Sequence, residues 1–266
     1  IRGRERQLVL LAPGRTEKLP LSGIAPDAVI RATPGLHAAR SGEFLQLELE
    51  PKTPLPFFGN VTLTLPDGSE TSLTVLAAPN ARLVTADTAS LENGARLVPV
   101  TATRGNSCAG LEKAGARVKF RFAPLPAGNY LVLSLHRVPA SRLIPNTGRP
   151  QVAEFDLLRP DGKRIPAGWG INPALDFYKA KYGSGMSRFK WDGPIEGKYP
   201  YQQLQIQALP EVDCLVFEAK QSAGTELAAV LILPAPSREF LVELQKTLCG
   251  LNYDPWRIAA GQSDTK

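Results

Sequence analysis

Between Glu43 and Val75, apolar and polar residues alternate, and this alternation constrains the fold more than any other feature of the chain. A period of two residues places the apolar side chains on one face of a strand, which is typical of half-buried antiparallel strands. Pro66-Asp67-Gly68 combines the fixed φ of proline with the permissive backbone of glycine, as a tight turn requires. We therefore predict a hairpin around this turn. The inward side chains of this region are Leu45, Leu47, Leu49, Val61, Leu63, Leu65, Leu73 and Val75.

Turn-forming residues are abundant along the whole chain. The 266 residues include 24 prolines and 23 glycines, which favours many short strands joined by turns. We predict an all-β fold of two tandem β-sandwich domains: an Ig-like sandwich over residues 1–78 and a larger, jelly-roll-like one over 79–256. A flexible tail follows at 257–266. The other predicted strands are 7–11, 27–31, 118–122, 130–136, 152–158, 202–208, 214–219 and 226–233.

Two segments of the second sandwich have a clear pattern of their own. Over 118–122, alternation turns Val118 and the two phenylalanines inward and leaves Lys119 and Arg121 outward. Near the end of the chain, a helix is predicted over 237–249, because Ser237 is a good N-cap and Gly250 can end a helix in the left-handed conformation. Its apolar stripe, which we expect to pack on the second sandwich, consists of Phe240, Leu241, Leu244 and Leu248.

Residues 169–201 hold an unusual concentration of aromatic side chains, among glycines and lysines and without a regular period. Such a segment is either a binding face or a small core of its own in which the rings fold under the loop. Both interpretations stay open on the sequence alone. As a binding face, its candidate residues are Trp169, Tyr178, Tyr182, Trp191, Tyr199, Tyr201 and Lys190.

The ligand of this loop is predicted from the chemistry of its side chains. Protein interfaces are enriched in tyrosine, tryptophan and arginine, which favours a protein partner. The alternative is a carbohydrate-binding module, because aromatic rings stack on the apolar faces of sugars. A third hypothesis is a glycan hydrolase with an acid pair. It ranks below these two because any polar loop contains acidic residues, and the basic charge of the segment lowers its rank slightly further. Its candidate carboxylates are Asp176, Asp192 and Glu196.

Enzymatic chemistry has no other support in the sequence. The chain contains no nucleophile elbow, zinc-protease motif or phosphate-binding loop, and His37 and His136 have no motif partners. We therefore predict no enzyme activity, no cofactor and no metal site. The net charge of +6 comes from scattered basic residues, so nucleic acid is not an expected partner. The longest apolar run, Leu227 to Leu233, is far short of the roughly 20 residues that span a bilayer.

The three cysteines bear on the compartment. Three pairings are possible, of which we favour a disulfide between Cys108 and Cys249, with Cys214 as a small buried hydrophobic residue. The start at Ile1 suggests that a leader or a preceding segment has been removed. These features favour a periplasmic or secreted protein. The first 75 or so residues, with Pro13-Gly14, Leu19-Pro20-Leu21 and the run Asn60 to Gly68, resemble the small β-domains of bacterial secretion and pilus machinery. Together they predict a non-enzymatic envelope scaffold or adaptor.

Overall fold

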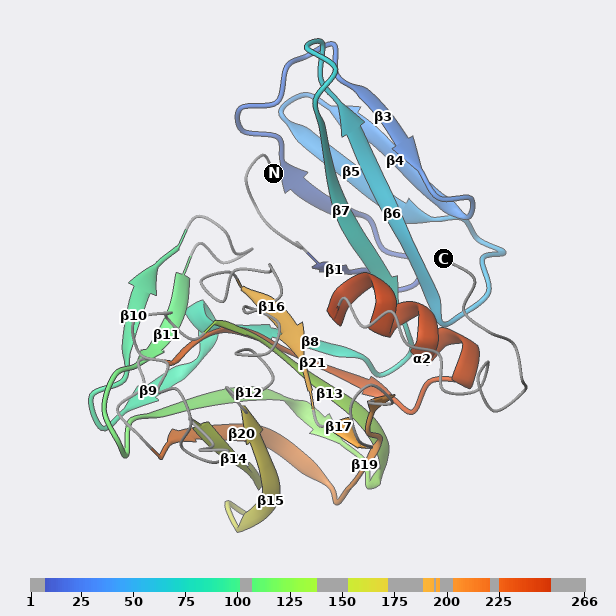
Figure 1. Cartoon of the computed structure of the whole chain (residues 1–266). Coiled ribbons are helices and arrows are strands. Elements are labelled where there is room, and N and C mark those ends of the chain that lie inside the picture. The colour runs from blue at the N-terminus through green and yellow to red at the C-terminus, as the bar shows by residue number, and fades with distance from the viewer. Residues whose placement is uncertain are drawn as a thin grey trace, which may run out of the picture.

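The computed structural model describes residues 8–100, 107–137, 153–171, 189–193, 195–196, 203–220 and 225–249. These residues form β-strands almost throughout, and α2 (Arg238–Leu244) is the only α-helix among them. A 3₁₀ turn, η1 (Ala86–Thr88), interrupts the strands. The predicted all-β class is therefore confirmed, and the strands are arranged in facing sheets (Figure 1).

The N-terminal strands form one sandwich, with a four-stranded sheet in the order β1-β7-β6-β3 and a three-stranded sheet in the order β2-β5-β4. Leu45, Leu47, Val61 and Leu63 are fully buried between the sheets, as their alternation predicted. The strands are β1 (Leu8–Leu10), β2 (Glu17–Pro20), β3 (Val29–Ala32), β4 (Leu36–Ser41), β5 (Phe44–Leu49), β6 (Phe57–Thr64) and β7 (Glu70–Ala77).

A larger sandwich follows, built from two sheets. One has the order β10-β11-β21-β13-β16, with β19 paired to β13 and β8 paired to β21. Its strands are β8 (Arg82–Thr85), β10 (Arg96–Pro99), β11 (Ser107–Leu111), β13 (Gly128–Arg137), β16 (Lys190–Asp192), β19 (Gln207–Leu209) and β21 (Thr225–Pro234).

The facing sheet has five strands in the order β15-β14-β20-β12-β9. Phe120 and Phe217 meet edge to face in the core between the two sheets, with ring centroids 5.7 Å apart. The strands of this sheet are β9 (Ser90–Glu92), β12 (Arg117–Leu125), β14 (Ala153–Leu158), β15 (Arg164–Ile171) and β20 (Val212–Ala219). A separate short ribbon pairs β17 (Ile195–Glu196) with β18 (Gln203–Leu204).

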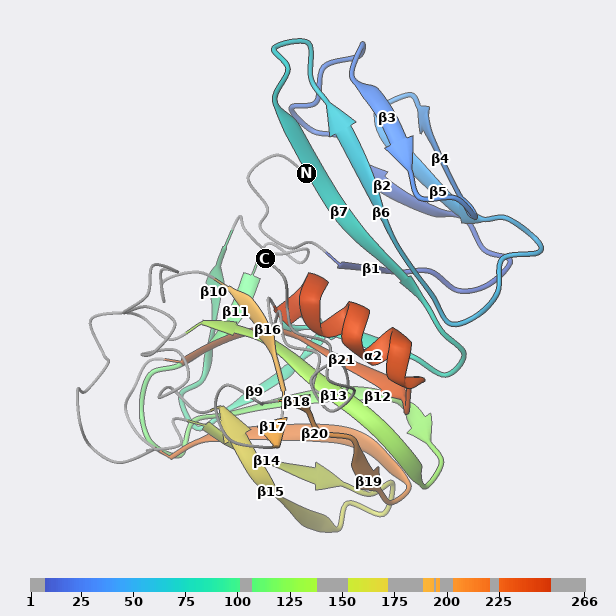
Figure 2. The same cartoon turned by 45° about the vertical axis from the view of Figure 1, so that its right-hand side comes forward.

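Helix α2 covers the outer face of the sheet that contains β13 and β21 (Figure 2). The helix begins as predicted, because Ser237 Oγ accepts a hydrogen bond from the backbone N–H of Phe240 at 3.3 Å. The last turn differs from the prediction, since Gln245–Cys249 form a π-helix, η3, in place of an α-helical end. The predicted apolar stripe is confirmed, with Leu241, Leu244 and Leu248 buried.

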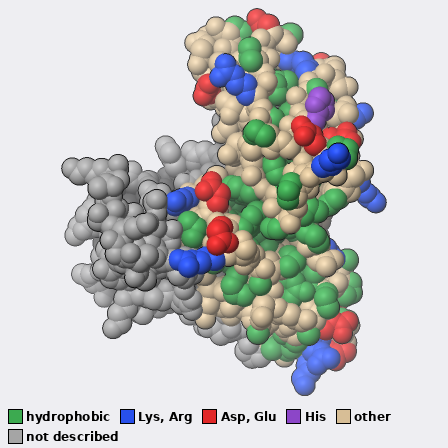
Figure 3. All heavy atoms as spheres, turned by 90° about the vertical axis from the view of Figure 1, so that its right-hand side faces the viewer, with side chains coloured by type: hydrophobic (Ala, Val, Ile, Leu, Met, Phe, Trp, Pro, Cys, Tyr) green, Lys and Arg blue, Asp and Glu red, His purple; other side chains and the backbone are tan. Residues whose placement is uncertain are grey.

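The same helix also contacts the N-terminal sandwich. Phe58 of β6 meets Phe240 of α2 edge to face, with centroids 6.0 Å apart, and Leu8 and Leu76 belong to the same hydrophobic cluster as Leu244. In the view of Figure 3, charged side chains lie mainly around the edges of the described surface, and hydrophobic ones lie mainly toward its middle. The boundary predicted at residues 78–79 remains a prediction.

Candidate functional site

Two aromatic residues of the predicted loop lie in the core. Trp191 is 1% exposed, and Phe189, two residues earlier, is also buried. Trp191 lies in β16, opposite Leu135 of β13, and belongs to the cluster under α2. Its ring helps to cover the apolar outer face of the sheet, so it is not available to stack on a ligand. This corrects the prediction that Trp191 is part of a binding face and favours the core interpretation for these two rings.

The other candidates of that loop lie partly or wholly outside the described residues. The backbones of Trp169 and Lys190 lie in β15 and β16, but their side chains fall outside the described part of the chain, as do those of Asp192 and Glu196. Residues 178, 182, 199 and 201, the predicted tyrosines, and Asp176 lie wholly outside the described residues. Their binding or catalytic roles remain predictions.

The predicted disulfide is not formed. All three cysteines are buried thiols, and Cys108 and Cys249 belong to the same hydrophobic cluster without being bonded to each other. Burial, together with the nearby Glu226, raises the pKa of Cys108 to about 12. The thiolate that disulfide formation requires is therefore strongly disfavoured. Cys214 is fully buried, as predicted.

The described part of the chain carries its clearest concentration of interacting charges on the outer face of the five-stranded sheet. Alternation along β12 turns Val118 and Phe120 into the core, so Arg117, Lys119 and Arg121 lie on the opposite face. In the same way Phe217 and Leu157 point inward, which leaves the neighbouring Glu218 of β20 and Asp156 of β14 outward. We call this surface the charged face. It consists of Glu92, Arg117, Lys119, Arg121, Asp156, Arg164, Glu218 and Lys220.

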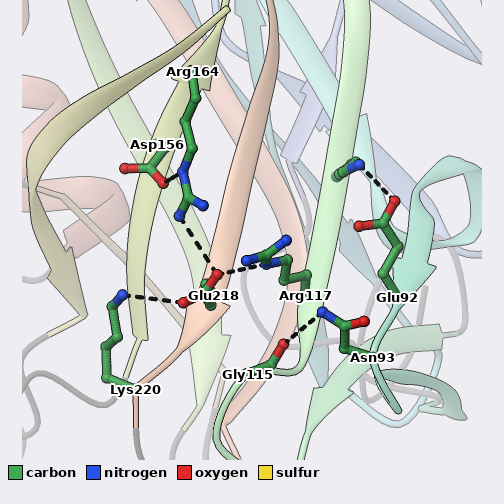
Figure 4. A network of polar contacts seen from close by, with 9 residues as sticks. Glu92, Asn93, Gly115, Arg117, Asp156, Arg164, Glu218 and Lys220 are labelled. Atoms are coloured by element: carbon green, nitrogen blue, oxygen red, sulfur yellow. Dashed lines mark hydrogen bonds and ion pairs between the residues drawn. The ribbon is translucent and has the colours of Figure 1, made fainter. Parts of the chain in front are cut away.

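Glu218 is the centre of the ion-pair network on this face (Figure 4). Its carboxylate lies 2.5 Å from Arg117 Nε, 3.1 Å from Lys220 Nζ and 3.5 Å from Arg164 Nη2. Arg164 is shared, because its Nε also donates to Asp156. A separate pair joins Lys119 Nζ to Glu92 Oε1 at 2.5 Å. The network thus links four strands of the sheet, β15, β14, β20 and β12.

The ionisation of Glu218 follows from these contacts. Partial burial raises its pKa, but hydrogen bonds from Lys220 and Arg117 outweigh this effect and hold the pKa below its ordinary value. Glu218 is therefore a carboxylate at neutral pH. A carboxylate that is ionised at neutral pH accepts hydrogen bonds and pairs with cations, but it is poorly suited to donate a proton as a general acid. The charged face therefore offers fixed hydrogen-bond donors and acceptors, and Glu218 is not suited to act there as a general acid.

Strand register shows how the charges are spaced. Arg121 pairs with Cys214, Cys214 with Leu158 and Leu158 with Arg164, so one row across the sheet has a guanidinium at each end and two apolar residues between. With strands roughly 4.8 Å apart, the Cα atoms at the ends of this row are about 14 Å apart. In the neighbouring row, Val216 separates Lys119 from Asp156. The apolar residues between the charged ones are not exposed, since Cys214 and Val216 are buried and Leu158 is half-buried.

A further polar contact lies in the interior of the protein. Ser134 Oγ and His136 Nδ1 lie 3.1 Å apart in β13, and both residues are buried. No group of three or more His, Cys, Asp and Glu residues could hold a metal ion in the described part of the chain. Among the described helices, none is long and apolar enough to cross a membrane.

Comparison with known proteins places the chain near β-sandwich structures only at low similarity. No protein-family model and no curated protein matches it. The C-terminal family 6 carbohydrate-binding module of a laminarinase from Zobellia galactanivorans covers 58% of this chain and 99% of its own, at 12% identity and a TM-score of 0.34. A carbohydrate-binding module of Cellvibrio mixtus lichenase 5A, solved with cellotriose, covers 58% and 98%, at 15% identity and a TM-score of 0.34. At this level of similarity, neither structure bears on the function of this chain.

Proposed function

We propose that this protein is a non-catalytic carbohydrate-binding protein and that its ligand lies on the charged face. The observation that carries the proposal is the ion-pair network, in which Glu218 contacts Arg117, Arg164 and Lys220 at the outer surface of the sheet. Sugar hydroxyls both donate and accept hydrogen bonds. Guanidinium and ammonium groups supply the donors, and carboxylates supply the acceptors. Holding these groups in ion pairs before the ligand arrives lowers the entropy cost of binding.

Polar contacts rather than apolar stacking would hold a ligand on this face, because Cys214 and Val216, which lie between the charged side chains, are buried and Leu158 is half-buried. The similar structures named above include carbohydrate-binding modules, but their likeness stops at the sandwich. The proposal therefore depends on the residues of this face.

The aromatic residues of 169–201 do not separate a protein partner from a glycan, because both hypotheses for that loop required exposed rings and Trp191 is buried. The proposal of a glycan depends on the charged face instead. The low pKa of Glu218 also gives no support to a hydrolase that uses this residue as its acid. A polysaccharide ligand agrees with the predicted periplasmic or secreted location, which forms part of the proposal.

Affinity electrophoresis on a panel of soluble polysaccharides tests the proposal. We expect wild-type protein to be retarded by at least one glycan, and Glu218→Gln to abolish that retardation because it weakens all three ion pairs at once. The matched control is Glu226→Gln. Glu226 is similarly buried and pairs with Arg137, but it lies on the opposite sheet, so this variant should still bind.

Melting curves accompany both variants, so that loss of folding is not mistaken for loss of binding. Exposed ion pairs contribute about 0–1 kcal/mol each, and Arg164 and Lys220 are 44% and 39% exposed. Glu218→Gln should therefore stay folded. The proposed function would be contradicted if no glycan retarded the wild-type protein. It would also be contradicted if a folded Glu218→Gln variant bound a glycan as wild type does.

A further inference from the structure

The cations of the charged face are not all neutralised. Arg117, Lys119, Arg164 and Lys220 each lie in an ion pair with Glu218, Glu92 or Asp156. Arg121 differs from them, because it is exposed and has no ion pair within the described part of the chain. It follows Lys119 by two residues on the same strand, so both side chains lie on the same face.

Arg121 also has a defined place relative to the rest of the site. It stands at the β12 end of the row that runs through Cys214 and Leu158 to Arg164. At the other end, Arg164 is already held by Asp156 and Glu218. The row thus ends in one guanidinium that is ion-paired within the protein and one, that of Arg121, that has no carboxylate partner within the described part of the chain.

The charged face as a whole has a net positive charge. The described side chains include five cations, Arg117, Lys119, Arg121, Arg164 and Lys220, against the three carboxylates of Glu92, Asp156 and Glu218. The chain as a whole carries a net charge of +6. A surface with a net positive charge concentrates anionic ligands. Guanidinium pairs with carboxylate or sulfate oxygens through two parallel hydrogen bonds.

We infer that the glycan bound by the charged face is anionic, a polysaccharide with carboxylate or sulfate groups, and that Arg121 pairs with one of these groups. The inference rests on the proposed function and gives its ligand a chemical class. The side chains of the network around Glu218 form hydrogen bonds with the sugar hydroxyls, and Arg121 forms an ion pair with the acidic substituent. A neutral glycan leaves the guanidinium of Arg121 without a partner and is therefore bound more weakly.

The test measures affinity by isothermal titration for three polymers of similar length: polygalacturonate for carboxylate, dextran sulfate for sulfate and dextran as the neutral reference. Arg121→Gln removes the charge and keeps a polar side chain. Arg31→Gln is the matched control, because Arg31 is also an exposed arginine within a strand, β3, of the N-terminal sandwich. Each titration is repeated at about 50 and 200 mM salt, since long-range attraction weakens as salt is added.

We expect wild type to prefer one of the acidic polymers, and Arg121→Gln to reduce that affinity about tenfold or more, as for the loss of a hydrogen bond to a charged group. Arg31→Gln should bind as wild type does. An equal loss in both variants would show general charge attraction and overturn the role of Arg121. Preference for neutral glycans in an extended panel would overturn the anionic class while leaving the proposed function intact. Failure to bind any glycan, acidic or neutral, would overturn both.

Discussion

Truncating Trp191 separates a core role for this residue from a binding role. Its side chain is 1% exposed and packs with Leu135 and Leu244 in the cluster beneath α2. Trp191→Ala removes the indole ring from a closed space, and such truncations cost about 3–5 kcal/mol of unfolding free energy. For a chain of this size, about 2–4 °C of melting temperature is lost per kcal/mol, so we expect a fall of about 6–20 °C. Differential scanning calorimetry measures it directly.

The same samples are tested for glycan binding well below their melting temperatures. Trp191→Ala should bind as wild type does, because β16 belongs to the sheet opposite the charged face. Trp191→Phe, which refills most of the space, should fall between the two in stability. If Trp191→Ala kept the melting temperature of wild type but lost glycan binding, the core role of Trp191 would be refuted and a binding role supported.

Three further predictions concern the core and the network. Gly193→Ala should lower stability by about 1–3 kcal/mol in urea titrations, because an added Cβ would lie 2.6 Å from the backbone oxygen of Val132, and an unchanged midpoint would contradict this contact. Cys108 and Cys214, with pKa values of about 12 and 11, should react with a thiol reagent at pH 8 only after unfolding, and rapid labelling of the native protein would contradict their burial. The folded-state pKa of Glu218 is depressed, so its contribution to stability is present above its ordinary pKa of 4.5 and disappears as the pH falls through the folded-state value. Urea titrations from pH 7 to pH 3 should therefore show the stability of wild type converging on that of Glu218→Gln, and a constant difference would be evidence against the network.

The parts of the fold that the sequence predicts are those with local causes. The hairpin of β6 and β7 follows from alternation and from a turn in which Gly68 adopts φ +79°. The start of α2 follows from the N-cap at Ser237. Strand β16 spans only three residues, too short for a period to be recognised, so the burial of Trp191 is decided by its pairing with β13.

Only part of the charged face could be predicted from the sequence, because strand alternation is local and strand pairing is not. Alternation alone places Lys119 and Arg121 on the outward side of their strand. Their relation to the carboxylates depends on which strands become neighbours, since Arg117 and Glu218 are 101 residues apart in the chain and Arg164 and Glu218 are 54 apart. No local pattern encodes that register. Long-range pairing of this kind becomes visible only when the sheet is assembled.

Stability and recognition make different demands on an ion pair, and two glutamates of this chain allow them to be compared. Glu226 pairs with Arg137, whose guanidinium also lies 4.7 Å from the centre of the Phe189 ring, so its pair is tied to the buried cluster under α2. Glu218 pairs with cations that are partly exposed on an outer face, where each pair adds little to stability. If the charged face exists to bind a ligand, Glu226→Gln should lower the melting temperature more than Glu218→Gln does, while only Glu218→Gln loses the glycan. If Glu218→Gln lowered the melting temperature more than Glu226→Gln does and still bound the glycan, the network on the five-stranded sheet would serve stability alone.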